Sequence, residues 1–158
     1  MNIEALYQIY SSNYFVTTDT RAIKKDAVFF SLQGEHFNGN KFAALAIEKG
    51  AKYAVIDDVT YQLQGKTILV NTVLQTLQKL ANYHRKQLNI PIIGITGSNG
   101  KTTTKELIHA VLATQFKTKA TKGNLNNHIG VPLTLLSFTN KTEIGIVEMG
   151  ANHQKEIE

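Results

Sequence analysis

The sequence predicts an α/β protein in two consecutive parts: a small α/β domain, then the truncated start of a second domain with a mainly parallel sheet. Apolar runs of strand length alternate with segments of helical periodicity along the 158 residues, which is typical of α/β folds. A long amphipathic helix ends near residue 88, and a new strand–turn–helix unit follows directly. We therefore expect a boundary at Asn89 and Ile90, between a domain 1–89 and a domain 90–158.

The elements of the first part follow from the spacing of apolar residues. Helical spacing occurs in three segments, 2–10, 41–51 and 72–88. Apolar runs of strand length are 26–32, 53–57 and 67–70. Gly50 suits the left-handed position that ends a helix, so the second helix should stop there. Val73, Leu77 and Leu80 share one face, which makes the third helix amphipathic.

The second part shows the same alternation. Its predicted strands are 90–95, 117–120 and 143–150, and its predicted helices are 103–115 and 131–138. Pro91 stands at the start of the first strand, where its missing N–H does least harm. Three strands fall short of the ~5–6 of a usual sheet, so we expect this chain to be the N-terminal piece of a longer protein.

Composition and charge argue against several classes of protein. The chain has no cysteine, so it forms neither disulfides nor thiolate metal sites. The first residues do not resemble a signal peptide, and no apolar run reaches the ~20 residues that span a bilayer. The net charge is +5, but the one basic cluster without acids, residues 117–124, has no aromatic residue to stack on bases. We expect a cytoplasmic protein without membrane insertion and without a nucleic-acid partner.

The segment GITGSNGKTTTKE, residues 94–106, predicts a phosphate site. A glycine turn that enters a helix directs backbone N–H groups and the positive end of the helix dipole at one place. Gly97 and Gly100 let the backbone approach phosphate oxygens, Lys101 can bridge terminal phosphates, and the Thr102 hydroxyl can ligate Mg²⁺. An isoleucine occupies the first glycine position of the general pattern G-x-x-x-x-G-K-[ST]. We still interpret the loop as a nucleoside triphosphate site.

Glu148 is the second candidate, because it ends the apolar run 144–147. Open α/β sheets bind ligands at the carboxyl ends of their strands. A carboxylate there is a natural second ligand for Mg²⁺ at the phosphate loop. The alternative is an ordinary acid that faces solvent. His153, in the turn that follows, is interpreted as a surface residue.

The third candidate is TKGNLNNHIGVPLTLL, residues 121–136. Its asparagines and its histidine lie between glycines and precede a helix, so they can serve as turn and cap residues. They can equally bind a polar substrate laid across the phosphate site. The residues alone leave both interpretations open.

Three motifs, GITGSNGKTTTKE, GNLNNHIGVPLTLL and VEMGANHQKEI, resemble the Mur ligase family in this order. The last two are most similar to its D-alanyl-D-alanine-adding branch. Upstream, residues 18–57 resemble the domain of that branch that holds the UDP end of the substrate, so the resemblance covers almost the whole chain. The family usually shows Asp-Gly-His where this chain has Asn38, Gly39 and Asn40, so a charge and an imidazole are missing there.

The resemblance implies an ATP- and Mg²⁺-dependent ligase of peptidoglycan precursor synthesis. In that family, ATP phosphorylates the terminal carboxylate of UDP-N-acetylmuramoyl-tripeptide, and the amine of D-alanyl-D-alanine attacks the acyl phosphate. The piece alone should be inactive, and we expect a monomer.

The resemblance also implies site residues. It makes Lys101 and Glu148 catalytic, with Thr102 and Glu148 as metal ligands. The residues implied for ATP are Thr96, Gly97, Ser98, Asn99, Gly100, Lys101 and Thr102. Those implied for the UDP substrate are Asp19, Thr20, Arg21, Asn38, Asn126 and Asn127.

Two alternatives stay open. A diaminopimelate- or lysine-adding ligase of the same family shares the loop and the first domain, although NLNNHIGVPLTLL argues against it. The other is a non-catalytic UDP-sugar- or ATP-binding module, which has no need of the metal pair.

Overall fold

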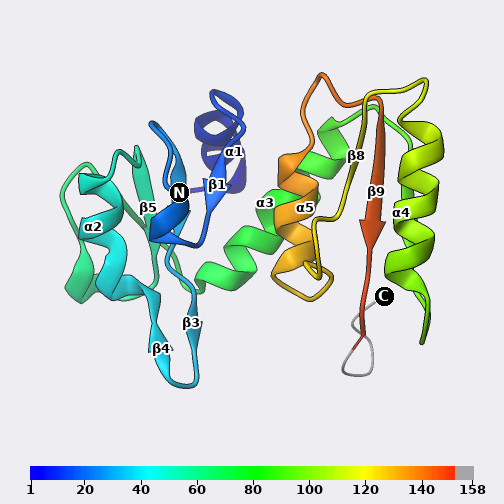
Figure 1. Ribbon diagram of the computed structural model, residues 1–158. Coiled ribbons are helices and arrows are strands. Elements are labelled where there is room, and N and C mark those ends of the chain that lie inside the picture. Colours follow the sequence, from blue (N-terminus) through cyan, green and yellow to red (C-terminus); the bar gives the residue numbers. More distant parts are fainter. Residues whose placement is uncertain (152–158) are drawn as a thin grey trace. The chain divides into compact units, whose positions relative to one another are not determined.

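The computed structural model describes residues 1–151. The chain divides into two compact units, Met1–Tyr83 and His84–Glu158. Each unit has a parallel sheet with helices, which confirms the predicted α/β class (Figure 1). The division falls within a helix, a few residues before Asn89, so the functional boundary at Asn89 and Ile90 stays a prediction.

The first unit has a four-stranded parallel sheet in the order β1-β2-β5-β6. Its strands are β1 (Val16–Thr17), β2 (Val28–Phe30), β5 (Tyr53–Ile56) and β6 (Thr67–Leu69), and a small antiparallel pair is formed by β3 (Gln33–Gly34) and β4 (Phe37–Asn38). Its helices are α1 (Ile3–Ser11), α2 (Ala43–Glu48) and the start of α3 (Val73–Gln87), with short 3₁₀ turns η1 (Thr20–Ala22), η2 (Gly39–Phe42) and η3 (Val59–Tyr61).

The core of the first unit explains these elements. All three residues of β2 are buried, as expected for a parallel strand covered on both faces. Helix α2 buries Ala43 and Ala46 against Phe29 and Ile56 of the sheet. Small side chains let this helix lie close to the strands.

In the second unit, the parallel sheet has the order β7-β9-β8. Its elements are β7 (Ile92–Ile95), α4 (Lys101–Leu112), β8 (Thr118–Ala120), α5 (Gly130–Ser137) and β9 (Ile144–Glu148). Helices α4 and α5 lie on either side of β9, which is the most buried strand of this three-stranded sheet (Figure 1). The register pairs Ile95 with Glu148, so the acid that ends β9 lies beside the start of the glycine turn.

A buried histidine joins two helical segments of the second unit. His84, near the end of α3, places Nε2 3.0 Å from the carbonyl oxygen of Phe138, which follows α5. A carbonyl can only accept, so Nε2 carries the proton. Burial lowers the pKa of His84, and the Phe138 carbonyl offsets part of that shift. The ring is therefore held in its neutral form.

Several boundaries differ from the predictions. Helix α4 begins at Lys101, two residues earlier than expected, because Gly100 is its left-handed N-cap. The strand expected over 26–32 is limited to Val28–Phe30. The two-residue strands β1, β3 and β4 had not been predicted, since such short pieces have no periodicity to detect. Within residues 1–151, no helix has the length and apolar character to cross a membrane.

Candidate functional site

The glycine turn between β7 and α4 has the backbone geometry that a phosphate site needs. Gly97 has φ +146° and Gly100 has φ +76°, which are values that L-residues rarely adopt. A Cβ built on either glycine would meet no heavy atom within 4 Å, so the space above the turn is open. The first N–H groups of α4 have no partner within the helix and lie at this turn.

The turn borders a hollow of about 510 Å³. Lining residues from the turn are Thr96, Gly97, Ser98 and Lys101, and those opposite are Asn126, Gly150 and Ala151. The Lys101 ammonium donates to the carbonyl oxygen of Gly97 at 2.6 Å, so its charge lies over the turn. The hollow therefore combines a cation, helical N–H groups and space, which suits an anionic ligand.

Glu148 lies at the end of β9 and is 1% exposed. Its Oε1 accepts hydrogen bonds from Thr102 Oγ1 at 3.1 Å and from Asn126 Nδ2 at 2.8 Å. Its backbone N–H donates to Thr121 Oγ1 at 2.9 Å. The structure thus brings together two residues 46 positions apart, the threonine that follows the glycine turn and the acid of the strand end.

This donor set fits Mg²⁺. The other carboxylate oxygen, Oε2 of Glu148, is buried and accepts no hydrogen bond. Mg²⁺ prefers oxygen ligands and is usually held by one or two carboxylates together with waters and substrate phosphates. Among residues 1–151 no cluster of three or more His, Cys, Asp or Glu forms a separate all-protein metal site. Glu148 and Thr102 are therefore the side chains that would hold the ion beside bound phosphates.

The loop from Thr121 to Gly130 uses its two expected asparagines differently. The Asn127 side chain caps α5, because its Oδ1 accepts from the N–H groups of Ile129 and Gly130 at 3.1 and 2.8 Å. Asn126 instead faces the hollow and holds Glu148. A direct substrate contact of either asparagine stays a prediction.

The first unit has a hollow of about 380 Å³ that joins two sequence-predicted segments. It is lined by Thr18, Asp19, Thr20, Arg21, Phe29, Phe37 and Phe42. Phe37 and Phe42 stack with ring centroids 5.6 Å apart and planes tilted by 14°. Both rings are partly exposed, so an apolar surface stands next to a cation.

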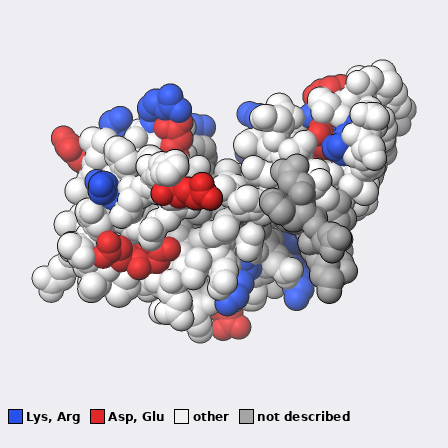
Figure 2. All heavy atoms as spheres, turned by 90° about the horizontal axis from the view of Figure 1, so that it is seen from below, with Lys and Arg blue, Asp and Glu red and all other residues white. Residues whose placement is uncertain are grey.

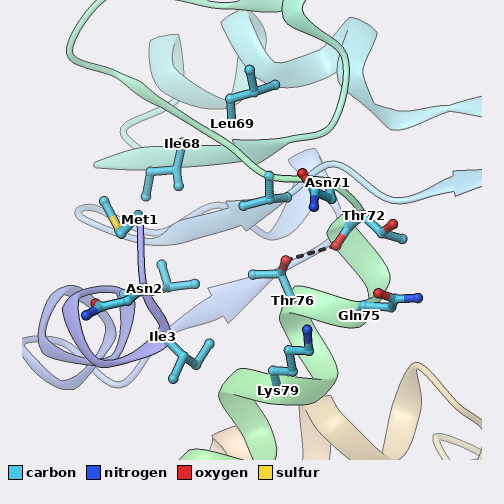
Figure 3. Close-up of a pocket in the computed structure, with 12 residues that line it drawn as sticks. Met1, Asn2, Ile3, Ile68, Leu69, Asn71, Thr72, Gln75, Thr76 and Lys79 are labelled. Atoms are coloured by element: carbon cyan, nitrogen blue, oxygen red, sulfur yellow. Dashed lines mark hydrogen bonds between the residues drawn. The ribbon is translucent and has the colours of Figure 1, made fainter.

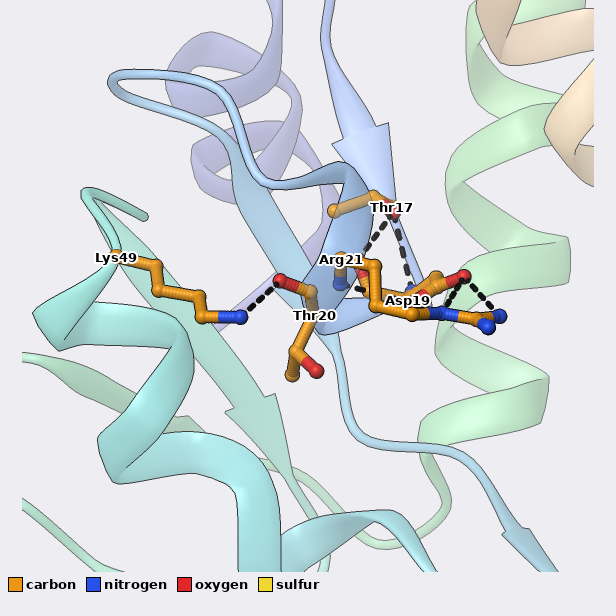
Figure 4. A network of polar contacts seen from close by, with 5 residues as sticks. All are labelled: Thr17, Asp19, Thr20, Arg21 and Lys49. Atoms are coloured by element: carbon orange, nitrogen blue, oxygen red, sulfur yellow. Dashed lines mark hydrogen bonds and ion pairs between the residues drawn. The ribbon is translucent and has the colours of Figure 1, made fainter.

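Asp19 and Arg21 shape the polar side of this hollow (Figure 4). Asp19 caps the turn η1 by accepting from the Arg21 N–H at 2.8 Å, and Arg21 Nη2 donates to Asp19 Oδ2 at 2.7 Å. These hydrogen bonds from Arg21 hold the pKa of Asp19 down at about 2. The Lys49 ammonium donates to the Thr20 carbonyl at 3.1 Å. The Arg21 side chain is 87% exposed, so its guanidinium is oriented by Asp19 yet accessible to an anion.

Asn38 does not line the hollow. Its Oδ1 accepts from the backbone and side-chain nitrogens of Asn40 at 2.9 and 3.0 Å. Asn40 is fully buried, and its amide donates to Asp57 Oδ1 at 2.9 Å. Asn38 and Asn40, which stand where the family usually has Asp and His, thus stabilise the turn after β4.

The first unit contains another hollow, of about 440 Å³, between the starts of α1 and α3 and the end of β6 (Figure 3). Polar side chains such as Asn71, Gln75 and Lys79 line part of it. None of the site residues that the sequence predicted lies there.

On the face drawn in Figure 2, basic side chains are interspersed with acidic ones.

Sequence reasoning missed four residues around these sites. Phe37 and Phe42 were not identified because isolated aromatics in a loop resemble core residues. Lys105 and Thr121 were missed because nothing in the local pattern shows that their side chains are buried beside Glu148. The i, i+4 spacing from Lys101 places Lys105 on the same helix face but does not reveal its burial.

Comparisons with known proteins cover most of the chain. Residues 13–96 match the family described as Mur ligase family, catalytic domain, and residues 95–158 match the Mur ligase middle domain. The UDP-N-acetylmuramoyl-tripeptide–D-alanyl-D-alanine ligase of Bacillus subtilis is 45% identical over 146 residues, which is 90% of this chain and 32% of that protein. The protein of the same name from Escherichia coli is 39% identical over 142 residues, 90% of this chain and 31% of its own.

Solved structures of similar proteins superpose on most of this chain. MurF from Acinetobacter baumannii superposes with a TM-score of 0.80 at 34% identity, over 89% of this chain and 31% of that one. MurF ligase from Thermotoga maritima in complex with ADP superposes with a TM-score of 0.79 at 30% identity, over 90% of this chain and 33% of that one. The chain thus spans about a third of the length of the relatives it matches.

Proposed function

The chain belongs to the Mur ligase family, and we propose that it supplies the ATP-phosphate site and the UDP site of a ligase that joins D-alanyl-D-alanine to UDP-N-acetylmuramoyl-tripeptide. The observation that carries the proposal is the contact between Thr102 of the phosphate loop and Glu148 of the strand end. The relatives named for this activity, and the relative solved with ADP, support it.

In the proposed reaction, a terminal carboxylate oxygen of the UDP-tripeptide attacks the γ-phosphorus of ATP and ADP leaves. The amine of D-alanyl-D-alanine then attacks the acyl carbon, and inorganic phosphate leaves as the amide bond forms. Phosphoryl transfer needs positioning and charge stabilisation more than covalent work by the protein.

The residues of the second unit divide this work. The first N–H groups of α4 and the Lys101 ammonium stabilise negative charge on the β- and γ-phosphates. Thr96, Gly97, Ser98, Asn99 and Gly100 form the cradle. Thr102 and Glu148 hold Mg²⁺, which when bound neutralises phosphate charge and polarises the transferred group.

The first unit recognises the uridine nucleotide in this proposal. Its hollow offers the exposed Arg21 guanidinium for an anionic group and the rings of Phe37 and Phe42 for a planar base. Asp19 and Thr20 supply acceptors and a hydroxyl. Asn38 contributes indirectly, through the turn that carries Phe37 and Phe42. Asn126 and Asn127 remain proposed contacts to the peptide end of the substrate.

Domain roles and location complete the proposal. Residues 1–89 would form the UDP-substrate domain and 90–158 the start of the ATP domain of a cytoplasmic, monomeric enzyme. The 158-residue chain alone would not complete the ligation, since it spans a third of the relatives' length.

Sequencing the gene beyond the codon for Glu158, followed by a phosphate-release assay of its whole product, tests the function. Turnover is expected with ATP, UDP-tripeptide and D-alanyl-D-alanine. Turnover instead with UDP-dipeptide and diaminopimelate or lysine would favour the other ligase. Nucleotide binding without turnover of either pair would favour the non-catalytic module.

A further inference from the structure

Helix α4 buries a single side chain, that of Lys105, which is 0% exposed. A buried ammonium is costly unless it is paired, and an apolar side chain of similar length would fill the same space at lower cost. The reason for a lysine here therefore lies in the groups around its Nζ.

The Lys105 ammonium contacts three segments of the second unit. Its Nζ lies 3.0 Å from Glu106 Oε1 and 3.6 Å from Glu148 Oε2, and it donates to the carbonyl oxygen of Gly123 at 3.4 Å. Glu106 is 63% exposed, so water screens that pair. The pair with Glu148 is buried on both sides, where charges interact strongly.

The two oxygens of Glu148 are restrained in different ways. Oε1 is fixed by hydrogen bonds from Thr102 and Asn126, whereas Oε2 faces the ammonium at a distance longer than the ~2.7–3.2 Å of an N–H···O hydrogen bond. Lys105 thus orients the carboxylate by charge and leaves the lone pairs of Oε2 unused. Its longer contact with the Gly123 carbonyl, at 3.4 Å, reaches the loop that carries Asn126.

We propose that Lys105 is a positioning residue, which holds the carboxylate of Glu148 in the orientation that binds the metal beside the nucleotide phosphates. The inference rests on the proposed nucleotide–metal function of this site. In this role Lys105 acts through Glu148, whose Oε2 it faces, rather than by direct contact with nucleotide or metal.

The test measures binding rather than turnover. Mn²⁺ replaces Mg²⁺ as a paramagnetic probe, and its affinity for the 158-residue chain is titrated by electron paramagnetic resonance with saturating ADP. Lys105→Met should weaken Mn²⁺ binding by about 10–100-fold, the usual effect of losing a group that orients a metal ligand. Affinity for ADP without metal should stay the same, because the phosphate turn and Lys101 are intact. The matched control Glu106→Gln removes only the exposed partner and should change neither affinity.

A double variant separates positioning from packing. If Lys105 acts through Glu148, then Lys105→Met combined with Glu148→Gln should bind Mn²⁺ no more weakly than Glu148→Gln alone. The double variant removes both buried charges and so leaves neither one unpaired. If Lys105→Met alone fails to fold, the double variant can still be compared with Glu148→Gln.

The outcomes are distinct. Unchanged Mn²⁺ affinity in Lys105→Met would overturn the positioning role. So would a fold-loss of ADP affinity, measured without metal, as large as the fold-loss of Mn²⁺ affinity. A further loss in the double variant beyond Glu148→Gln would do the same. If the unaltered chain binds neither ADP nor Mn²⁺, the proposed function itself fails, and the role of Lys105 fails with it.

Discussion

At the scale of the residue, Lys101 gives the sharpest prediction about catalysis. Its ammonium lies over the glycine turn, where negative charge would accumulate in the proposed phosphoryl transfer. In the whole gene product, Lys101→Ala should lower kcat at least ~10²–10³-fold, the usual cost of one preorganised electrostatic donor. Folding should survive, because a lysine at a helix N-terminus opposes the local dipole. Phosphate release and thermal unfolding measure the two effects.

Two further variants test whether the position and the shape of the Lys101 charge matter. Lys141→Ala removes an exposed lysine of the same unit and should leave kcat unchanged. Lys101→Arg should not restore activity, because a planar fork replaces a compact ammonium in a tight turn. Near-normal turnover of Lys101→Ala would remove the phosphate-loop interpretation.

Asp57 gives a prediction about pH. Burial acts to raise its pKa, but hydrogen bonds from the Val73 N–H, Asn40 and Gln33 outweigh burial, so the pKa is lowered in the folded state. Asp57→Asn replaces an acceptor by an amide that faces these donors, and it should cost about 1–3 kcal/mol at neutral pH. Urea unfolding followed by circular dichroism measures the loss.

The sign of the pH effect follows from linkage. A carboxyl whose folded pKa is depressed contributes stability above its unfolded pKa of ~3.9, and that contribution disappears as pH falls through the folded pKa. The difference between Asp57→Asn and the unaltered chain should therefore shrink in strong acid. A difference that stays constant from neutral pH to strong acid would disprove the role of the ionised carboxylate. Asp58→Asn, which alters the cap of a short 3₁₀ turn, is the neighbouring control.

At the scale of the element, the glycine turn and α4 depend on the backbone of Gly100. Its φ of +76° costs an L-residue roughly 1–2 kcal/mol, so Gly100→Ala should lower the free energy of unfolding by about that amount. Gly34→Ala is the matched control, since its Cβ would meet no atom within 4 Å and no positive φ is needed. Equal stability of the two variants in urea would show that the turn is not held in this conformation.

The elements that could be predicted are those with periodicity. The helix over 72–88 and the buried strand at 53–57 appear as α3 and β5, because several residues in each repeat the pattern. The parallel pairing in the first unit could not be predicted, since strand order depends on which surfaces pack together. The start of α4 was misjudged because the positive φ of Gly100, rather than side-chain pattern, sets it.

At the scale of the whole molecule, the sequence marked the site residues that belong to a motif or end a strand. It did not mark the side chains that pack around them. Lys101, Thr102 and Glu148 could be proposed because a motif and a strand end mark them. The burial of Lys105 and the stacking of Phe37 on Phe42 depend on tertiary packing, which no local pattern contains. Asn127 accepts hydrogen bonds at the start of α5, as the cap interpretation expected, and its contact with substrate stays a prediction.

The central claim is that the chain carries two separate nucleotide sites, one for UDP in the first unit and one for ATP phosphates in the second. Amide chemical-shift mapping of the 158-residue chain, titrated with UDP and then with ADP and Mg²⁺, tests it most directly. We predict that UDP shifts the amides of residues 18–21 and 37–42, and that ADP with Mg²⁺ shifts those of residues 96–102. UDP shifts confined to residues after Ile90, or ADP shifts that spare the glycine turn, would contradict the account.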